Sequence, residues 1–259
     1  MKKRSLKQFI LFHVLSVLSV VLIMDLPSVA ATRLRLAPDS IHIGVFFSGE
    51  SVQVSGKIPT GSQAILEVFG KRIEEQLLRK GRHWDIWMSV GEIDIEDAPY
   101  LYFALSTDPT EFSGQSADAQ SGYAALKRKV YFKGDVRGMT RPEIFNRFIE
   151  LKEEENLYSL QPGALKTSDP AGDSVTVQGS FRIPSRILPG NYTIRLSVLN
   201  HGRLIKSETT VLSVRMNGLP AFLSSLSRRH GALYGLFAVG IAIICGFLVG
   251  VAFKRGRTH

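Results

Sequence analysis

The chain has 259 residues, of which 32 are Lys or Arg and 23 are Asp or Glu, giving a formal net charge of +9. This excess lies at the two ends, with +3 in residues 1–31 and +6 in residues 215–259, whereas residues 32–214 are neutral with 22 basic and 22 acidic side chains. A nucleic-acid partner is therefore excluded, because phosphate binding needs a basic surface on the folded body. The single cysteine, Cys245, excludes an intramolecular disulfide, so the core alone must stabilise the body.

The N-terminal segment predicts a secretory signal peptide over residues 1–31. Basic residues begin at Lys2, an apolar run follows from Phe9 to Met24, and the small residues Ser28–Ala31 suit cleavage. An uncleaved anchor is the alternative, since the apolar run is long. Both versions place the following body, residues 32–217, outside the cytoplasm.

The first part of the body predicts three short strands. Runs rich in Val, Ile and Phe occupy residues 41–47, 51–58 and 64–69 and are separated by tight turns. Alternating side chains in the second run have the period of two that is typical of a half-buried strand. With no helix between them, we expect the three strands to pair antiparallel, as at the beginning of an immunoglobulin-like sandwich.

The segment 71–173 has a mixed pattern. Lys71–Lys80 is charged and suits a ribbon or a short helix, residues 84–88 alternate like a strand, and Tyr100–Leu105 predicts a further strand. Residues 108–122 are rich in Ser, Gln, Asp and Gly and predict a loop.

A helix is predicted over about residues 141–156. Thr140 and Glu143 have the spacing of a capping box, and Pro142 lies in the first turn, where its missing N–H is not needed. Helical spacing gives an apolar face formed by Ile144, Phe145, Phe148, Ile149 and Leu151. The charged residues are expected to be mostly exposed, namely Arg147, Glu150, Lys152 and Glu153–Glu155.

The last part of the body is again rich in strands. Val175–Ile183 and Tyr192–Leu199 alternate, and Asn200–Gly202 closes a hairpin onto Leu204–Val214. The predicted fold class is mainly β, an immunoglobulin-like antiparallel β-sandwich with a helix-containing elaboration, plus one C-terminal transmembrane helix. In this arrangement residues 34–70 and 174–216 build one sandwich, and two separate small β-domains are the alternative.

The C-terminal segment predicts one transmembrane helix over residues 233–253. These 21 residues contain no charged, Asn, Gln or Pro side chain. At about 1.5 Å per residue they match a hydrocarbon core of about 30 Å. Residues 218–232 then form a juxtamembrane segment and residues 254–259 a cytoplasmic tail. The predicted location is the inner membrane, crossed once, with the body in the periplasm.

Small residues recur every four positions within the span, which places them on one face of the helix. A second helix can approach closely along such a face. The sequence therefore predicts a packing face for a partner helix or for self-association, formed by Ala238, Ala242, Gly246 and Gly250.

Six short stretches of the chain are informative when taken together, namely Ile86-Trp87-Met88, Pro99-Tyr100-Leu101-Tyr102, Leu157-Tyr158, Phe181-Arg182-Ile183-Pro184, Pro189-Gly190-Asn191-Tyr192 and Leu233-Tyr234-Gly235-Leu236. With these stretches the chain resembles a family of alphaproteobacterial transmembrane proteins. The chain departs from the family at Asn156, where Gly is more usual. The resemblance implies a secreted body with a C-terminal anchor and assigns no activity. It also implies an association with a sulfite-exporter-like permease.

No pattern of catalytic or metal-binding residues is present, so we predict no enzyme, no metal and no cofactor. The sequence has neither a His-Glu-x-x-His nor a Gly-x-Ser-x-Gly pattern, and its histidines are scattered. The candidates for a recognition surface are four aromatic residues, Trp84, Trp87, Tyr100 and Tyr102. A strand over 84–88 would place Trp84 and Trp87 on opposite faces.

The combined features predict a non-enzymatic, membrane-anchored periplasmic protein that acts by protein–protein contact. Its expected partners are the lipid bilayer and an integral membrane protein, as an accessory to an inner-membrane transporter or envelope complex. A periplasmic ligand-binding or sensing module is the alternative. A polar pocket in the body would favour the alternative.

Overall fold

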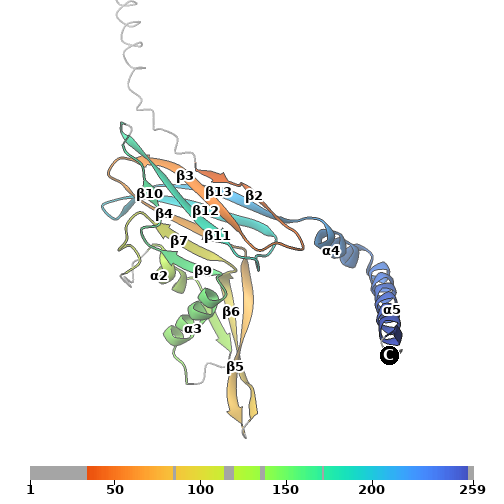
Figure 1. The fold of residues 1–259 in the computed structure, drawn as a ribbon. Helices are drawn as coiled ribbons and strands as arrows, with labels where there is room; N and C mark the ends of the chain where they lie inside the picture. Colours follow the sequence, from red (N-terminus) through yellow and green to blue (C-terminus); the bar gives the residue numbers. More distant parts are fainter. Residues whose placement is uncertain (1–33, 84–85, 114–119, 135–137, 171, 256–259) are drawn as a thin grey trace, which may run out of the picture. The chain divides into compact units, whose positions relative to one another are not determined.

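The computed structural model describes residues 34–83, 86–113, 120–134, 138–170 and 172–255. The predicted signal peptide, Trp84 and most of the predicted tail lie outside these residues. The chain is mainly β, with an immunoglobulin-like sandwich and a C-terminal apolar helix (Figure 1).

Two sheets form the sandwich. The four-stranded sheet has the order β1 (Arg35–Ala37), β3 (Glu50–Pro59), β11 (Ser174–Ile183), β10 (Lys166–Thr167). The six-stranded sheet has the order β2 (Ser40–Ile43), β13 (Arg203–Met216), β12 (Gly190–Asn200), β4 (Gln63–Phe69), β7 (Tyr102–Ser106), β9 (Tyr158–Gln161).

The inner faces of the two sheets are apolar and touch each other. On β3, Val52, Val54 and Ile58 are buried, whereas Gln53 and Lys57 on the other face are exposed. Gly56 lies so close to β12 that an added Cβ would come within 2.9 Å of Leu196 Cδ2. The alternation expected of half-buried strands thus builds one core between the sheets.

The strand order matches that of immunoglobulin domains, in which one sheet holds strands A, B, E and D and the other G, F and C. The first strand is divided, because β1 pairs antiparallel with β3 and β2 pairs parallel with β13. At the start of β12, in the place of strand F, the Tyr192 hydroxyl donates a 2.7 Å hydrogen bond to the Leu188 carbonyl. This is the tyrosine corner of such domains. Ile194 is buried two residues later, where antibody domains have the second cysteine of their disulfide.

The prediction that the first three strands pair with one another is wrong. β2 pairs with β13, β3 with β11, and β4 with β12, so each turn carries the chain from one sheet to the other. The alternation of side chains shows that a strand has one buried face, but it does not show which sheet the strand joins.

The segment 71–173 contributes to the sandwich as well as elaborating it. It supplies β7 and β9 to the six-stranded sheet and β10 to the other. It also forms a third sheet of β5 (Arg72–His83), β6 (Ile86–Pro99) and β8 (Tyr131–Gly134), with helices α2 (Gly122–Lys127) and α3 (Arg141–Glu154). In Figure 1 the β5–β6 ribbon extends from the sandwich beside α3.

Helix α3 begins as its sequence predicts. The Thr140 N–H donates to Glu143 Oε2 at 2.7 Å, which confirms the capping box. The predicted apolar face is buried except for Leu151. Lys152 was expected to be exposed, but it is buried. It follows Phe148 by four residues and therefore lies on the apolar face.

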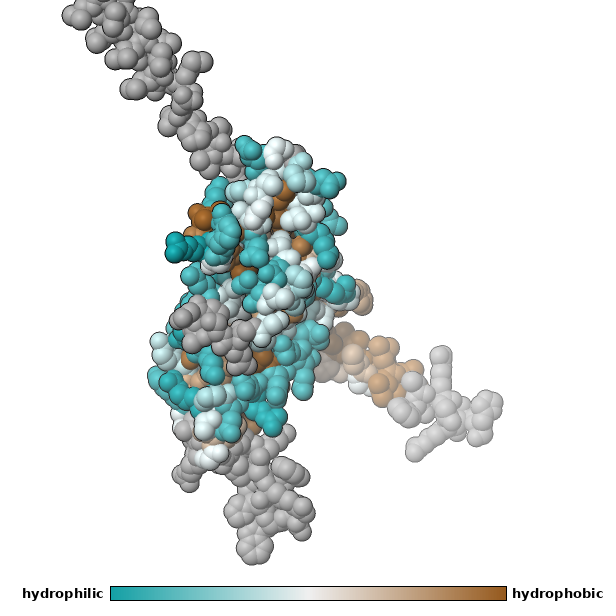
Figure 2. Space-filling view, turned by 90° about the vertical axis from the view of Figure 1, so that its left-hand side faces the viewer, coloured by the Kyte–Doolittle hydropathy of each residue, from teal (hydrophilic) through white to brown (hydrophobic). Residues whose placement is uncertain are grey.

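Two helices follow the sandwich. Helix α4 (Leu219–Arg229) is short, and α5 (Gly231–Arg255) contains the predicted span. Residues 231–251 of α5 are long and apolar enough to cross a membrane, and none of them is buried in the protein. By contrast, Figure 2 shows a face of the body that is mostly hydrophilic, with apolar residues in separate patches.

Candidate functional site

A cluster of charged and aromatic side chains fixes the β5–β6 ribbon to the body. At its centre is Lys152, whose side chain is 3% exposed. Its ammonium Nζ donates to Glu75 Oε1 of β5 at 2.5 Å and lies 3.8 Å from Glu155 Oε2. The rings of Tyr100 and Phe148 lie 5.8 and 5.6 Å from Nζ, within the range of cation–π attraction.

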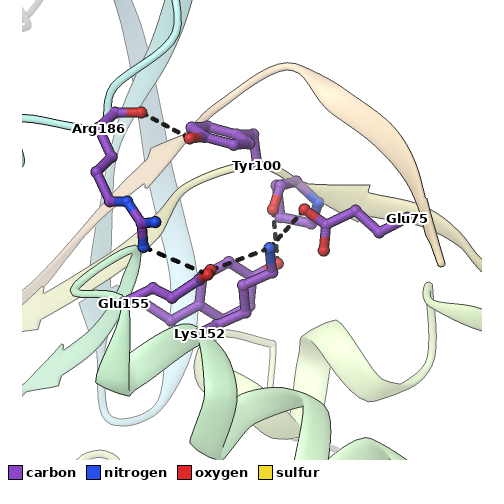
Figure 3. Close-up of polar contacts among 7 residues, drawn as sticks. Glu75, Tyr100, Lys152, Glu155 and Arg186 are labelled. Atoms are coloured by element: carbon purple, nitrogen blue, oxygen red, sulfur yellow. Dashed lines mark hydrogen bonds and ion pairs between the residues drawn. The ribbon is translucent and has the colours of Figure 1, made fainter. Parts of the chain in front are cut away.

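The cluster continues to the loop between β11 and β12. Arg186 Nη1 lies 3.6 Å from Glu155 Oε1, and the Tyr100 hydroxyl donates to the Arg186 carbonyl at 2.6 Å. Figure 3 shows Lys152 between the two carboxylates, with Arg186 and Tyr100 beside them. Burial, followed by the nearby Glu155 carboxylate, raises the pKa of Tyr100 above its ordinary value of 10. This hydroxyl therefore stays protonated and remains a donor at neutral pH.

The contacts of this cluster hold separate parts of the chain together. We call its residues Glu75, Tyr100, Lys152, Glu155 and Arg186 the clamp. A buried ammonium beside two carboxylates is stable only while the ion pairs hold, because an unpaired charge in the interior is costly. The ion pairs join the strand β5, the C-terminal end of the helix α3 and the β11–β12 loop, and Tyr100 adds the link between β6 and β7 through its hydrogen bond to Arg186 and its ring over Lys152. The clamp therefore fixes the base of the ribbon against both α3 and the sandwich.

Beyond the clamp the ribbon continues as two strands alone. β8 pairs with β6 only over residues 93–96. From Arg79 to Gly91, β5 and β6 pair only with each other within the described part of the chain. An isolated two-stranded ribbon is marginally stable in water, so this portion depends on its anchored base.

The structure describes three of the four aromatic residues that were predicted to form a recognition surface, and the three lie in different surroundings. Trp84 lies outside the described residues, and Trp87 is in the distal part of β6, opposite Arg82. Tyr100 is half-buried over Lys152. Tyr102 is not a surface residue at all, because only 1% of it is exposed.

Tyr102 belongs to a second buried polar network, within the six-stranded sheet. Its hydroxyl donates to Glu67 Oε1 at 2.8 Å and accepts the Gly122 N–H at 2.8 Å. Arg195 Nη2 donates to Glu67 Oε2 at 2.6 Å, and the guanidinium lies 4.9 Å from the centre of the Phe69 ring. Burial, followed by the Glu67 carboxylate, raises the pKa of Tyr102 well above 10. The network joins strands β4, β7 and β12 to the start of α2.

In both networks the carboxylates are paired with cations, and the tyrosine hydroxyls donate hydrogen bonds. Within the described ranges, no group of three or more His, Cys, Asp or Glu side chains could hold a metal ion.

One surface depression of about 680 Å³ lies over β1, β3, β10 and β11. Amide, hydroxyl and basic side chains contribute to its lining, among them Gln53, Gln178, Ser180, Arg35 and Lys166. Such groups donate and accept hydrogen bonds, as a polar ligand requires.

The four small residues of the predicted packing face are all exposed on α5. At Gly246 and Gly250, an added Cβ would have no atom within 4 Å apart from the adjacent residues and the backbone of the helix itself. Nothing within the described chain covers this face, so it is open to a neighbouring helix.

Comparison with known proteins gives a match over most of the chain. A family model described as "Putative transmembrane protein (Alph_Pro_TM)" matches residues 32–255. Among solved structures, murine CRIg is similar with 11% sequence identity and a TM-score of 0.26, over 73% of this chain and 100% of that chain. The comparison with curated proteins gives no match.

Proposed function

Because the chain belongs to this family of transmembrane proteins, we propose that it is a non-enzymatic membrane-anchored protein that acts by contact with another protein. The partner in this proposal is an integral membrane protein of the inner membrane, for which the chain serves as an accessory in a transporter or envelope complex. A sulfite-exporter-like permease is one such partner.

The topology is part of the same proposal. The apolar run before Ser28–Ala31 directs export, α5 anchors the chain, and the sandwich lies in the periplasm with the C-terminus in the cytoplasm. A reporter enzyme fused near residue 120 tests this arrangement. Activity of a periplasmic reporter is expected, and activity of a cytoplasmic reporter would contradict it.

The observation that supports contact with a protein is the distal ribbon, residues 79–91. It pairs only with itself among the described strands, yet a buried ion pair fixes its base. A long ribbon without a core of its own gives the sandwich little stability. Its two strands have open outer edges, and such edges bind other chains through main-chain hydrogen bonds.

A shortened ribbon gives a direct test. Leu78 and Glu92 are directly paired, so an Asn-Gly turn joining them in place of residues 79–91 closes the hairpin. This variant keeps Glu75 and the clamp. The matched control retains the ribbon and carries Gln53→Ala and Gln178→Ala in the surface depression.

Each variant is expressed in the native host, solubilised in detergent and purified with its partners for mass spectrometry. The wild type and the control are expected to recover the same membrane protein, and the shortened variant to lose it. Thermal melting shows that the shortened variant is folded. Recovery of the partner by the folded, shortened variant would refute the role of the ribbon. Recovery of no partner by the wild type would refute the proposal as a whole.

A ligand-binding or sensing module is the second candidate, and the polar surface depression favours it. Binding of a small periplasmic solute there would raise the melting temperature of the wild type. The same solute would leave the melting temperature of the double variant Gln53→Ala, Gln178→Ala unchanged, because this variant lacks two side chains of the surface depression.

A further inference from the structure

One end of the sandwich carries exposed apolar side chains from three segments. Phe46 is 96% exposed and Val45 60% exposed in the turn between β2 and β3. Leu188 of the β11–β12 loop and Met216 at the end of β13 are exposed as well. We call these four residues the apolar tip.

The strand register places the three segments of the apolar tip at the same end. Ile43, the last residue of β2, lies opposite Met216, and Glu50, the first residue of β3, lies opposite Ile183 of β11. In Figure 1 the β2–β3 turn and the end of β13 lie on the side from which the chain leads to α4.

The turn that carries Phe46 is held in place from both sides. The Phe47 N–H donates to the Gly44 carbonyl at 3.3 Å, and Phe47 packs against the core. The Asn217 N–H donates to the Ile43 carbonyl at 2.9 Å. In this turn Phe47 takes the inward position and Phe46 is exposed, so the Phe46 ring is accessible to a surrounding apolar medium.

The chain that leaves this end enters the membrane within a short distance. Met216 is three residues before the start of α4, and α5 follows α4 almost at once. The apolar residues of α4 recur at the spacing of one helix face, at Leu219, Phe222, Leu223 and Leu226, and Arg228 and Arg229 end the helix. This pattern is typical of a helix that lies in the membrane interface.

The charges around the apolar tip suit a lipid surface. Arg182 donates from Nη2 to the Ser48 carbonyl of the β2–β3 turn at 3.1 Å, Arg215 precedes Met216, and both arginines are exposed. Basic side chains beside apolar ones favour the region of anionic headgroups. At the opposite end of the sandwich, the turns at residues 60–62 and 201–202 contain only polar residues and glycine, and the nearest exposed apolar residues, Leu204 and Ile205, lie within β13.

We propose that the apolar tip inserts into the interface of the bilayer that α5 spans, and that it fixes the sandwich upright on the membrane. The occupant of this surface is lipid. The proposal does not depend on the partner of the ribbon, because its test needs only the chain and lipids.

The test uses the full chain in phosphatidylcholine–phosphatidylglycerol vesicles with a single tryptophan. Trp84→Phe and Trp87→Phe remove the native tryptophans, and Phe46→Trp places a reporter in the tip. Thr60→Trp, at an exposed position in the turn at the opposite end, is the matched control. We expect blue-shifted emission and strong quenching by lipids brominated in their acyl chains for Phe46→Trp, and neither effect for the control.

Equal emission and equal lack of quenching at the two positions would overturn the proposal. A second measurement covers a failure of the tryptophan-free protein to fold. A nitroxide on Phe46→Cys in a Cys245→Ala background should be more accessible to oxygen than to a water-soluble nickel chelate. The reverse ranking would overturn the proposal, as would protection of the nitroxide only after another membrane protein is added.

Discussion

The ion pair between Lys152 and Glu75 offers the sharpest test of the clamp. In Glu75→Leu, the ammonium of Lys152 remains 3% exposed, with only Glu155 at 3.8 Å to balance it. In Lys152→Met, the remaining Glu75 carboxylate is 22% exposed and water can reach it. We therefore expect Glu75→Leu to destabilise the protein more than Lys152→Met.

The magnitude follows from the burial of each partner. Breaking a fully buried ion pair costs about 3–5 kcal/mol, and the remaining Glu155 reduces this to about 2–3 kcal/mol for Glu75→Leu. Lys152→Met should cost about 1–2 kcal/mol because its orphaned carboxylate is partly hydrated. The double variant should come within about 1 kcal/mol of the wild type, since apolar replacements of a buried pair are often neutral.

The free energy of unfolding is measured by denaturant titration of the full chain in detergent, with circular dichroism as the readout. In a thermal melt with the same readout, the melting temperature of Glu75→Leu should be about 5–10 °C below that of the wild type. Arg147→Met is the matched control, because Arg147 forms an exposed i,i+3 pair with Glu150 and should cost at most about 0.5 kcal/mol. Additive single-variant effects in the double variant, or a larger loss for Lys152→Met, would refute the reasoning.

Three further predictions concern other parts of the chain. Tyr192→Phe removes the hydroxyl that donates to Leu188, and should lower the free energy of unfolding by about 1 kcal/mol in the same titration. The raised pKa of Tyr102 means that only the unfolded chain loses this proton near pH 10, so the contribution of Tyr102 to stability should be fully present below about pH 10 and be lost as the pH rises above it. Tyr102→Phe should make the fall between pH 10 and 11.5 shallower, and an identical slope would contradict this. Gly246→Leu with Gly250→Leu should abolish crosslinking of α5 to a neighbouring helix in the membrane, whereas the exposed Ile244→Leu should preserve it.

Features that depend on neighbouring residues were predictable from the sequence. The start of α3 follows from Thr140, Pro142 and Glu143, which lie within four positions. The apolar helix α5 follows from an uninterrupted run of residues. The sandwich class follows from alternation in strands such as β3 and β12, because one face of each strand is apolar.

Features that depend on distant partners were not predictable. The burial of Lys152 requires Glu75, which lies 77 residues away and becomes a neighbour only when β5 pairs with β6. The burial of Tyr102 likewise requires Glu67 and Arg195 from two other strands. The burial of Lys152 could have been inferred from one local observation, because Lys152 lies on the apolar face of its helix. An isolated charge on such a face predicts a partner elsewhere in the chain.

The divided first strand has a consequence for the order of assembly. β2 cannot pair until β13 has been made, and β13 is the last strand of the described chain. β3 cannot pair with β11 until more than 100 further residues have been made. During synthesis, the four-stranded sheet can therefore form only after residue 183 has emerged, and the six-stranded sheet only after residue 216. The anchor begins at residue 231, so maturation of the sandwich coincides with entry of the helix into lipid. The six-stranded sheet of the nascent chain is thus completed in the same short interval in which α5 is made and reaches lipid.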